Sequence, residues 1–514
     1  MARYNHFVRG LFSSYAAIGI NIFYTLASVP LALHYLNKEE FGLWALVTQL
    51  SGYLMLLEFG MTGSVARSLS DHKDNIENGI YGNILRTATR VFTIQGGLVA
   101  ILGVSFAWFG GPLLGLPKSM EGLFTLLMSG QAILSGLRLA FTASGAPLWC
   151  HQRLDLSNLA TGLSLITAFA ALWLGFFWGC HLFSILIASA IGSALAIGLS
   201  YIFCCHFNFY PTREKRGQFD FAVFRDLFHF GSGLFLMNLG LQLTSASQVI
   251  IVSRILGVEA AATWSICTKI FTMAQQFVSR IFDSSAGGLA EMFVRHEIER
   301  LKSRFRDLVS ISAIIACAVG AGISLMNGSF VKLWTSGEVA WPDWNNYLLA
   351  AVLLVTSVTR CHIGLSGITK QILGMKYVYF IEGLCFVSLS AVLVPHMDFI
   401  GLLLSALVSN IITTGAYGVY RTADFFEIPI HEVFCWVARP FYFLAPLAGI
   451  FILLLLPSIS SIQTNFKLSL EVAIFVIIII PIIWIFVVGS ELQSEIKLFF
   501  RKFGTFFPSK SYKL

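Results

Sequence analysis

Residues 135–145 read SGLRLAFTASG, and residues 357–367 read SVTRCHIGLSG, so the pattern S-x-x-R-x5-S-G occurs twice in the chain. A shift of 222 residues superimposes Arg138 on Arg360. Both copies stand inside long apolar runs, where polar residues are rare. Polar identities that recur at one offset in such runs are typical of a duplicated helical unit. The pattern therefore predicts two structurally equivalent halves.

A second set of matches extends this repeat toward the start of each half. A shift of 220 residues superimposes residues 36–39 on residues 256–259 and Trp44 on Trp264. Nearly the same offset therefore holds for segments about a hundred residues apart. Each half is expected to contain six spans, an even number, so the two copies share one orientation in the membrane.

The composition places most of the chain in lipid. Of 514 residues, 56% are hydrophobic and 12% are charged, against roughly 25% charged in an ordinary soluble domain. A soluble protein is thereby excluded. The formal net charge of +7 fits anionic headgroups and the positive-inside bias, so no nucleic-acid partner is expected.

Apolar runs bounded by polar residues, glycine or proline predict an all-α polytopic membrane protein with about 14 transmembrane helices. A spanning helix needs about 20 such residues. Twelve of the spans belong to the two six-helix repeats, and two C-terminal helices are added to them. The predicted spans are 10–34, 41–66, 84–109, 122–148, 157–177, 182–206, 228–256, 258–285, 309–327, 346–370, 377–395, 400–420, 436–457 and 468–489.

The same runs define five segments. The expected segments are an N-terminal six-helix lobe (1–206), a cytoplasmic linker (207–227), a C-terminal six-helix lobe (228–421), extra helices 13 and 14 (436–489) and a basic cytoplasmic tail (490–514).

The distribution of Lys and Arg predicts the orientation. If the N-terminus is cytoplasmic, the outside loops contain only Lys38, Lys118, Lys332 and Lys467. Lys and Arg concentrate on the cytoplasmic side of membrane proteins, so both termini are expected there. The first span is interpreted as retained rather than as a signal peptide. The nine cysteines form no C-x-x-C pair, and no metal site is expected.

Polar residues inside the spans fall on narrow helical faces. Gln131, Ser135, Arg138 and Thr142 share a sector of span four, and Lys269, Gln276, Arg280 and Asp283 share one in span eight. A charge near the bilayer centre costs about 2.5–3.5 kcal/mol, so these faces should line a wet cavity. Cations outnumber carboxylates there, which predicts an anionic ligand.

Charged residues inside the predicted spans form two groups of candidate site residues. The candidates for an anionic headgroup are Arg138, Arg360, Lys269 and Arg280, and those for coupling or gating are Glu58, Asp283, Arg90 and Glu382. Arg138 is expected about ten residues from the nearest helix end.

Each of these assignments has a plainer alternative. Arg280 and Asp283 could simply pair with each other. Glu58 could pair with an arginine or titrate as a coupling carboxylate. Arg86 and Arg90 could extend to the headgroups at helix ends. His362 is interpreted as a satisfied polar contact rather than a proton relay.

Catalytic motifs are missing from the sequence. It contains no P-loop, no G-x-G-x-x-G and no G-x-S-x-G elbow, and neither His296-Glu297 nor His431-Glu432 has the second histidine of a zincin. We expect no enzyme, no catalytic residues and no cofactor, apart from a possible coupling ion, H⁺ or Na⁺.

Residues 35–47, YLNKEEFGLWALV, followed by LLEFGM at residues 56–61, resemble the opening helical pair of Wzx-type polysaccharide (O-antigen) flippases. These belong to the multidrug/oligosaccharidyl-lipid/polysaccharide exporter superfamily. The motif match is confined to roughly the first seventy residues, whereas the plan of six, six and two helices covers the chain.

The resemblance implies a bacterial inner-membrane protein that moves an undecaprenyl-pyrophosphate-linked oligosaccharide from the cytoplasmic to the periplasmic leaflet by alternating access. It also implies a cationic cavity for the pyrophosphate and a groove for the lipid tail beside the last two helices. Expected partners are the lipid-linked oligosaccharide, membrane lipids, a polysaccharide polymerase and glycosyltransferases. The alternatives are a cation-coupled multidrug exporter of the same superfamily and a membrane enzyme that acts on lipid-linked sugars.

Overall fold

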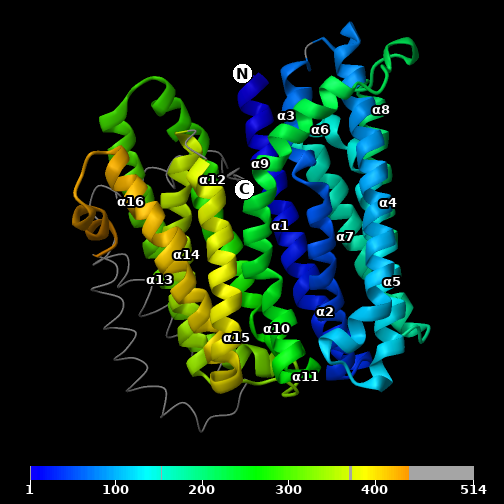
Figure 1. Cartoon of the computed structure of the whole chain (residues 1–514), viewed down its shortest axis with the longest axis vertical. Helices are drawn as coiled ribbons and strands as arrows, with labels where there is room; N and C mark the ends of the chain where they lie inside the picture. Colours follow the sequence, from blue (N-terminus) through cyan, green and yellow to red (C-terminus); the bar gives the residue numbers. More distant parts are fainter. Residues whose placement is uncertain (1, 74, 152, 370–372, 439–514) are drawn as a thin grey trace, which may run out of the picture. The chain divides into compact units, whose positions relative to one another are not determined.

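A computed structural model describes residues 2–73, 75–151, 153–369 and 373–438, and all regular structure among these residues is helical (Figure 1). The all-α fold class is thereby confirmed. The α-helices are α1 (Ala2–Tyr35), α2 (Lys38–Leu54), α3 (Met61–Asp71), α4 (Ile80–Leu114), α5 (Lys118–Ala140), α6 (Ala146–Cys150), α7 (Leu154–Phe177), α8 (Phe183–His206), α9 (Phe221–Ser245), α10 (Ser247–Leu256), α11 (Val258–Cys267), α12 (Lys269–Val294), α13 (Ile298–Trp334), α14 (Trp344–Ile368), α15 (Leu373–Asn410) and α16 (Ala416–Phe425).

Shorter helical turns join several of these. Four are 3₁₀ turns and one is a π-helix: η1 (Met55–Glu58), η2 (Ile76–Asn78), η3 (Thr142–Ser144), η4 (Arg213–Lys215) and the π-helix η5 (Ile411–Gly415).

Ten helical stretches in the described part of the chain are long and apolar enough to cross a membrane. The protein is therefore a multi-pass membrane protein. The stretches are Ala16–Tyr35, Lys38–Glu58, Ile80–Leu114, Lys118–Ser144, Asp155–Phe177, Phe183–His206, Phe235–Leu256, Ile298–Trp334, Trp344–Ile368 and Gly374–Phe425.

The difference from the predicted count of spans has three sources. Predicted span 258–285 is helical as α11 and α12, but α12 carries Lys269, Arg280 and Asp283 and is not among the ten stretches. Predicted spans 377–395 and 400–420 are counted as one stretch, but Asp398 between them is non-helical, with a φ of 50°, so two helices meet there at a kink, as the two predicted spans require. Span 468–489, the tail 490–514 and most of span 436–457 lie outside the described residues.

Helix contacts divide the chain into two compact units. Unit 1 is Met1–Thr268 with Leu373–Ser409, and unit 2 is Lys269–Ile372 with Asn410–Leu514. The expected lobes, 1–206 and 228–421, have different bounds, because α9, α10 and α11 pack on α2 and α3 within unit 1. The division into two six-helix repeats stays a prediction.

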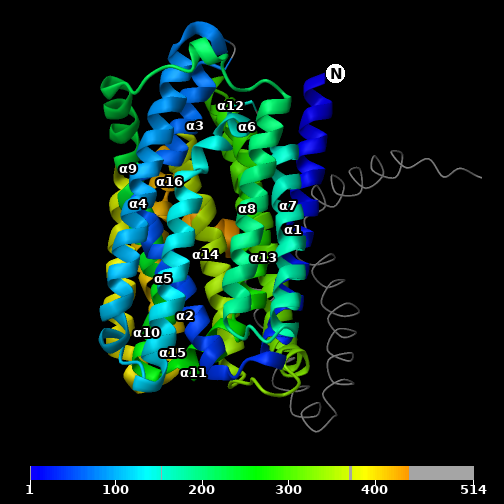
Figure 2. The ribbon, with the colours of Figure 1, turned by 90° about the vertical axis from the view of Figure 1, so that its right-hand side faces the viewer.

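In unit 1 the long helices pair through small residues, and Figure 2 shows α4, α5, α7 and α8 running nearly parallel. A Cβ at Gly96 would lie 2.3 Å from the carbonyl oxygen of Gly136, and one at Gly136 would lie 2.4 Å from that of Gly96. Helices α4 and α5 therefore touch backbone to backbone, which no larger residue would allow at either position.

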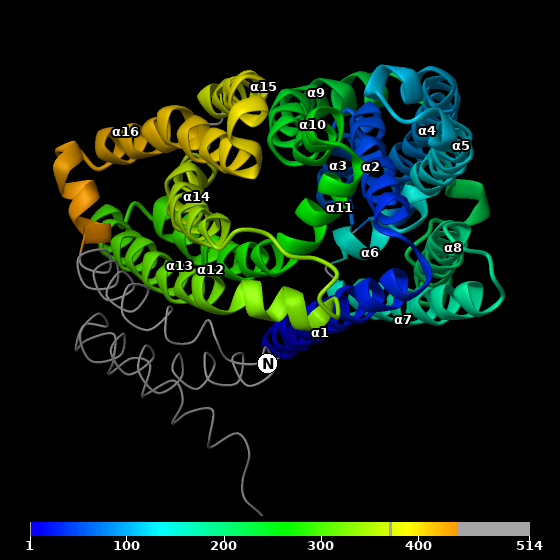
Figure 3. The same ribbon diagram turned by 90° about the horizontal axis from the view of Figure 1, so that it is seen from below.

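The repeated starts of the two halves also meet within unit 1. Asn37 caps α2, with its side chain accepting from the Glu40 amide at 2.8 Å, and Gly257 stands in the equivalent place before α11. Helix α2 packs on α11, as Figure 3 shows from below. A Cβ at Gly42 would lie 2.0 Å from the carbonyl oxygen of Val258. The two matching segments are thus in backbone contact.

Helix α2 does not continue through the predicted span 41–66. It ends in η1, and Phe59 and Gly60 then take left-handed φ values of 54° and 69° before α3 begins. Glycine tolerates this region at no steric cost. The polypeptide therefore turns here, and Glu58 comes to lie at the start of α3.

Unit 2 is built on α12, α13 and α14, which pack on one another. Its core includes Phe305 and Leu301 of α13 and Cys361 of α14, all nearly inaccessible to solvent. Residues 430–438 are also helical, and Trp436 packs against Phe305 with ring centroids 6.2 Å apart.

Candidate functional site

The predicted site residues are shared between the two units. Unit 1 contains Arg138 on α5, Glu58 in η1, Arg90 on α4 and Glu382 on α15. Unit 2 contains Lys269, Arg280 and Asp283 on α12 together with Arg360 on α14.

Arg360 and Asp283 form an ion pair that joins α14 to α12. The distance from Arg360 Nη2 to Asp283 Oδ1 is 2.8 Å, and the two side chains are 41% and 37% exposed. Asp283 therefore pairs with the arginine of the repeated motif. The alternative in which Arg280 pairs with Asp283 is not the arrangement found, because the carboxylate oxygen accepts from the facing helix. Arg280 is exposed on α12.

A second polar contact lies one helical turn from this pair on α14. Gln275 Nε2 donates to Thr356 Oγ1 at 3.4 Å, again between α12 and α14. The helical periodicity predicted Gln276 on the polar face, but Gln276 is exposed and Gln275 makes the contact. Gln275 and Gln276 lie about 100° apart around the helix. The sequence does not show which of the two faces α14, so it could not distinguish them.

Lys269 stands apart from these contacts, at the first residue of α12. It is half-buried and follows Thr268, where α11 has ended. The break between α11 and α12 therefore places an ammonium group at a helix start inside the predicted span.

A network of uncharged polar residues links α14 to the π-helix. Thr359 Oγ1 donates to Asn410 Oδ1 at 2.9 Å, and Asn410 Nδ2 donates to Thr414 Oγ1 at 3.0 Å. All three residues are buried. π-Helical turns occur often at functional sites. The sequence signal for this network is a lone asparagine within an apolar run, which a search for charged residues passes over.

His362 confirms the expectation of a satisfied polar contact. It is 1% exposed, and its Nδ1 lies 2.9 Å from Thr422 Oγ1. The Thr422 hydroxyl donates to the carbonyl oxygen of Gly418 at 2.9 Å, so it must accept from the ring. Nδ1 therefore carries the proton, and His362 joins α14 to α16.

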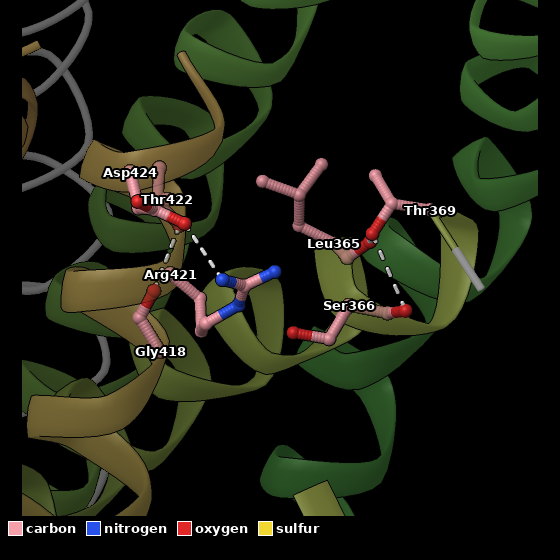
Figure 4. Close-up of polar contacts among 7 residues, drawn as sticks. All are labelled: Leu365, Ser366, Thr369, Gly418, Arg421, Thr422 and Asp424. Carbon is pink, nitrogen blue, oxygen red and sulfur yellow. Dashed lines mark hydrogen bonds and ion pairs between the residues drawn. The ribbon is translucent and has the colours of Figure 1, made fainter. Parts of the chain in front are cut away.

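Figure 4 shows the ends of these two helices. On α16, Arg421 pairs with Asp424 at 2.6 Å beside Thr422. On α14, Thr369 Oγ1 donates to the carbonyl oxygens of Leu365 and Ser366. The Thr369 side chain thus binds two of the last four carbonyls of α14, which have few partners within the helix.

In unit 1, Arg138 is exposed but near a helix end, which corrects the expected ten residues. Helix α5 ends at Ala140, and η3 and α6 follow. Pro147 stands in the first turn of α6, where its missing amide donor leaves no helical hydrogen bond unmade. The copy in α14 has no proline and remains helical to Ile368. Ser135 and Ser357 are both buried.

Glu58 has a structural role that neither alternative foresaw. Its Oε1 accepts from the backbone amide of Thr62 at 2.7 Å, which satisfies an unpaired donor in the first turn of α3. Gln95 Nε2 donates to the backbone carbonyl oxygen of Glu58 at 3.1 Å. The carboxylate therefore stabilises the turn between η1 and α3.

The remaining two candidates of unit 1 have different surroundings. Arg90 is exposed, and its guanidinium carbon lies 5.8 Å from the centre of the Phe219 ring. Such cation–π contacts are favourable within about 6 Å. Glu382 is 7% exposed on α15, beside Gly383, where α15 packs closely on α9. The structure thus separates these two residues by environment, one facing solvent or headgroups and the other inside the helix packing.

Comparison with known proteins assigns this fold. An inward-facing multidrug resistance MATE family transporter of the MOP superfamily superimposes with a TM-score of 0.65 at 14% identity, covering 78% of this chain and 94% of that chain. The lipid II flippase MurJ, in an inward closed conformation, gives 0.63 at 11% identity, covering 96% of this chain and 99% of that chain. A MOP superfamily transporter from Pyrococcus furiosus gives 0.59 at 14% identity, covering 81% and 95%.

At the level of sequence, no curated protein matches the chain. The model of the family described as polysaccharide biosynthesis protein matches residues 7–286, which is more than half of it. The chain therefore belongs to the polysaccharide biosynthesis protein family and has the all-helical fold of MOP-superfamily transporters.

Proposed function

We propose that the protein is a flippase that moves an undecaprenyl-pyrophosphate-linked oligosaccharide from the cytoplasmic to the periplasmic leaflet by alternating access. Membership in a polysaccharide biosynthesis family and the fold shared with a lipid II flippase support this proposal. The membrane is the bacterial inner membrane, with both termini in the cytoplasm, and the product serves O-antigen or exopolysaccharide assembly. A polysaccharide polymerase and glycosyltransferases are the proposed partners.

The observation that carries the proposal is the charge on the facing helices of unit 2. Between Lys269 and Asp283, and along α14, the charged residues are Lys269, Arg280 and Arg360 against the single carboxylate of Asp283. Arginine makes charge-assisted and often bidentate contacts with phosphate oxygens. A pyrophosphate therefore suits this face better than a cationic or neutral ligand.

Asp283 allows two states of the face formed by α12 and α14, one with Arg360 paired to Asp283 and one with Arg360 released. In the structure it holds Arg360 at 2.8 Å, which leaves Lys269 and Arg280 for the first contact with the headgroup. The pyrophosphate then competes with Asp283 for Arg360. Protonation of Asp283, or binding of Na⁺ to it, would release the arginine, which makes Asp283 the proposed coupling carboxylate. Glu58 is the weaker candidate because it caps α3.

The MATE fold favours a second candidate function, a cation-coupled multidrug exporter. A site for cationic drugs needs an excess of carboxylates, and the α12–α14 face has the opposite excess. The flippase is therefore the better account. The third possibility, a membrane enzyme on lipid-linked sugars, would be supported only by glycan polymerisation in the purified protein.

The proposal is tested in cells that lack their own copy of the gene. Cells with Arg138→Ala and Arg360→Ala together should lose surface polysaccharide and accumulate the lipid-linked intermediate in the inner leaflet, at wild-type protein level. Arg300→Ala is the matched control, since Arg300 is exposed and pairs with Glu297 at 2.9 Å on the surface. Normal export by the double variant would contradict the role of the arginines.

A further inference from the structure

A separate pocket lies within unit 1. It has a volume of about 250 Å³ and lies among the start of α4, the end of α5, α8 and the linker segment before α9. Its polar lining includes Arg86, Thr89, Tyr201, Tyr210 and Arg216. None of these is a residue proposed above to act in transport.

The charge of this pocket is positive. Arg86 comes from α4 and Arg216 from the linker segment, and both are exposed. Among the described residues that line it, none is an aspartate or a glutamate. Two guanidinium groups from different elements, without a lining carboxylate, favour a ligand with several anionic oxygens, such as a phosphate.

The linker segment that supplies Arg216 is fixed to α4. A Cβ at Gly82 would lie 2.1 Å from the carbonyl oxygen of Lys215. Gln218 donates its backbone amide to Asn83 Oδ1 at 2.8 Å, and Asp220 donates its amide to Thr87 Oγ1 at 3.0 Å. Arg216 is therefore held near the first turns of α4 rather than carried on a free loop.

Two tyrosines also line the pocket. Tyr210 donates its hydroxyl to the carbonyl oxygen of Ser144 at 2.6 Å, and its ring centre lies 5.7 Å from that of Tyr201. Tyr201 is exposed on α8. Tyrosines with one apolar and one wet side are typical of the boundary between membrane and water. These tyrosines therefore favour a position of the pocket at the depth of lipid headgroups.

An apolar stripe runs away from the pocket along α5. Leu126, Ile133, Leu137 and Phe141 are all exposed, and their spacings of 7, 4 and 4 residues place them on one face. Phe141 also lines the pocket. On a spanning helix such a face contacts acyl chains, so a lipid with its phosphate in the pocket could lay its chains along this stripe.

We propose that this pocket binds an anionic phospholipid through its phosphate, held by Arg86 and Arg216, with the acyl chains along the α5 stripe. The ligand belongs to the surrounding leaflet and is not the transported substrate. The proposal therefore stands whether or not the protein is a flippase.

The test measures lipid affinity for the full-length protein in detergent by native mass spectrometry. Wild type should bind phosphatidylglycerol at least about tenfold more tightly than phosphatidylcholine, and the double variant Arg86→Gln/Arg216→Gln should lose about tenfold in phosphatidylglycerol affinity. The charge-matched control is Arg225→Gln/Arg300→Gln, because both residues are exposed and line none of the described pockets. The control should keep wild-type affinity.

Three outcomes would overturn the proposal. These are wild-type affinity in the double variant, an equal loss in the control, and displacement of the lipid by millimolar glycerol phosphate, which would assign the pocket to a soluble phosphate. If the double variant fails to fold, each single variant is measured instead. Both single variants must then bind phosphatidylglycerol more weakly, while Arg→Lys at the same positions must restore part of the affinity.

Discussion

Arg360 on α14 donates from Nη2 to Oδ1 of Asp283 on α12, at 2.8 Å. The pair brings together two predicted site residues of opposite charge that lie 77 positions apart in the chain. It also explains how an arginine can be placed in a membrane-spanning helix: its charge has a partner on the facing helix. The pair must open before Arg360 can bind an anionic headgroup with its full set of donors.

Removing the carboxylate should therefore strengthen headgroup binding. In Asp283→Asn, we expect affinity for a soluble pyrophosphate-lipid analogue to rise by up to about fivefold, since a partly exposed ion pair contributes about 0.2–1 kcal/mol. Transport turnover should fall, because the proposed coupling carboxylate is lost. Isothermal titration calorimetry measures the affinity. Glu291→Gln is the control, because Glu291 pairs with Arg295 at the exposed end of the same helix. An unchanged affinity in Asp283→Asn would contradict the competition.

The contact between α2 and α11 should not tolerate a methyl group. Gly42→Ala would place a Cβ 2.0 Å from the carbonyl oxygen of Val258, and overpacking of this kind costs about 1–3 kcal/mol. We expect a lower melting temperature in a thermal shift assay. Gly97→Ala on α4 is the matched control, since nothing lies within 4 Å of the added atom. A Gly42→Ala protein as stable as the control would show that the helices separate freely.

The hydrogen bond between α14 and α16 should stabilise unit 2. Thr422→Val removes the acceptor of the His362 Nδ1–H, and a buried donor without a partner costs about 1–3 kcal/mol. The variant should unfold at lower temperature or lower denaturant concentration. Thr422→Ser keeps the hydroxyl and should recover most of the loss. Equal stability of Thr422→Val and wild type would argue against the proton on Nδ1.

The linker should loosen in acid. Thr212 donates its amide and hydroxyl to Glu77 at 3.0 and 2.8 Å, and these hydrogen bonds lower the pKa of Glu77. Because the pKa is lowered, these hydrogen bonds stabilise the folded protein fully above the pKa that Glu77 has in the unfolded chain. Their contribution to stability is lost as the pH falls through the pKa of Glu77 in the folded protein. Hydrogen-exchange protection factors for residues 207–217 should drop over that range. The Glu77→Gln variant should show low hydrogen-exchange protection already at neutral pH and no further drop in acid. An acid-dependent drop as large as that of the wild type would mean that another group, not Glu77, is being protonated.

The architecture was largely readable from the sequence, because apolar runs and their breaks are dictated by the bilayer. Each of the ten candidate spans overlaps a predicted run. Local geometry was not readable. The break at Phe59–Gly60 depends on a left-handed turn, and α5 ends at Ala140 within an apolar run, so neither leaves a trace in hydropathy. The division into two compact units depends on packing between helices distant in sequence.

The site was readable only in part. The repeated motif led to Arg360, and the charge pattern of α12 led to Asp283, which the structure joins. Their partnership was not foreseen, since a spacing of three residues favoured Arg280 instead. Asn410 was not predicted as a site residue, because the candidates were charged residues in apolar runs and an amide side chain carries no charge. Helical periodicity predicts which residues share one face of a helix. It does not predict which neighbouring helix that face packs against.

The most direct measurement is the rate at which purified protein in proteoliposomes moves a fluorescent pyrophosphate-linked oligosaccharide between leaflets. Wild type should move it, and Arg360→Ala should slow it by about ten- to a hundredfold, since hydrogen bonds to charged groups contribute about 1.5–3 kcal/mol. Arg421→Ala, which removes the half-buried arginine that pairs with Asp424 away from Arg360 and Asp283, should keep the wild-type rate. Equal rates for Arg360→Ala and wild type would contradict the arginine-based account of headgroup recognition, and no movement by the wild type would contradict the flippase itself.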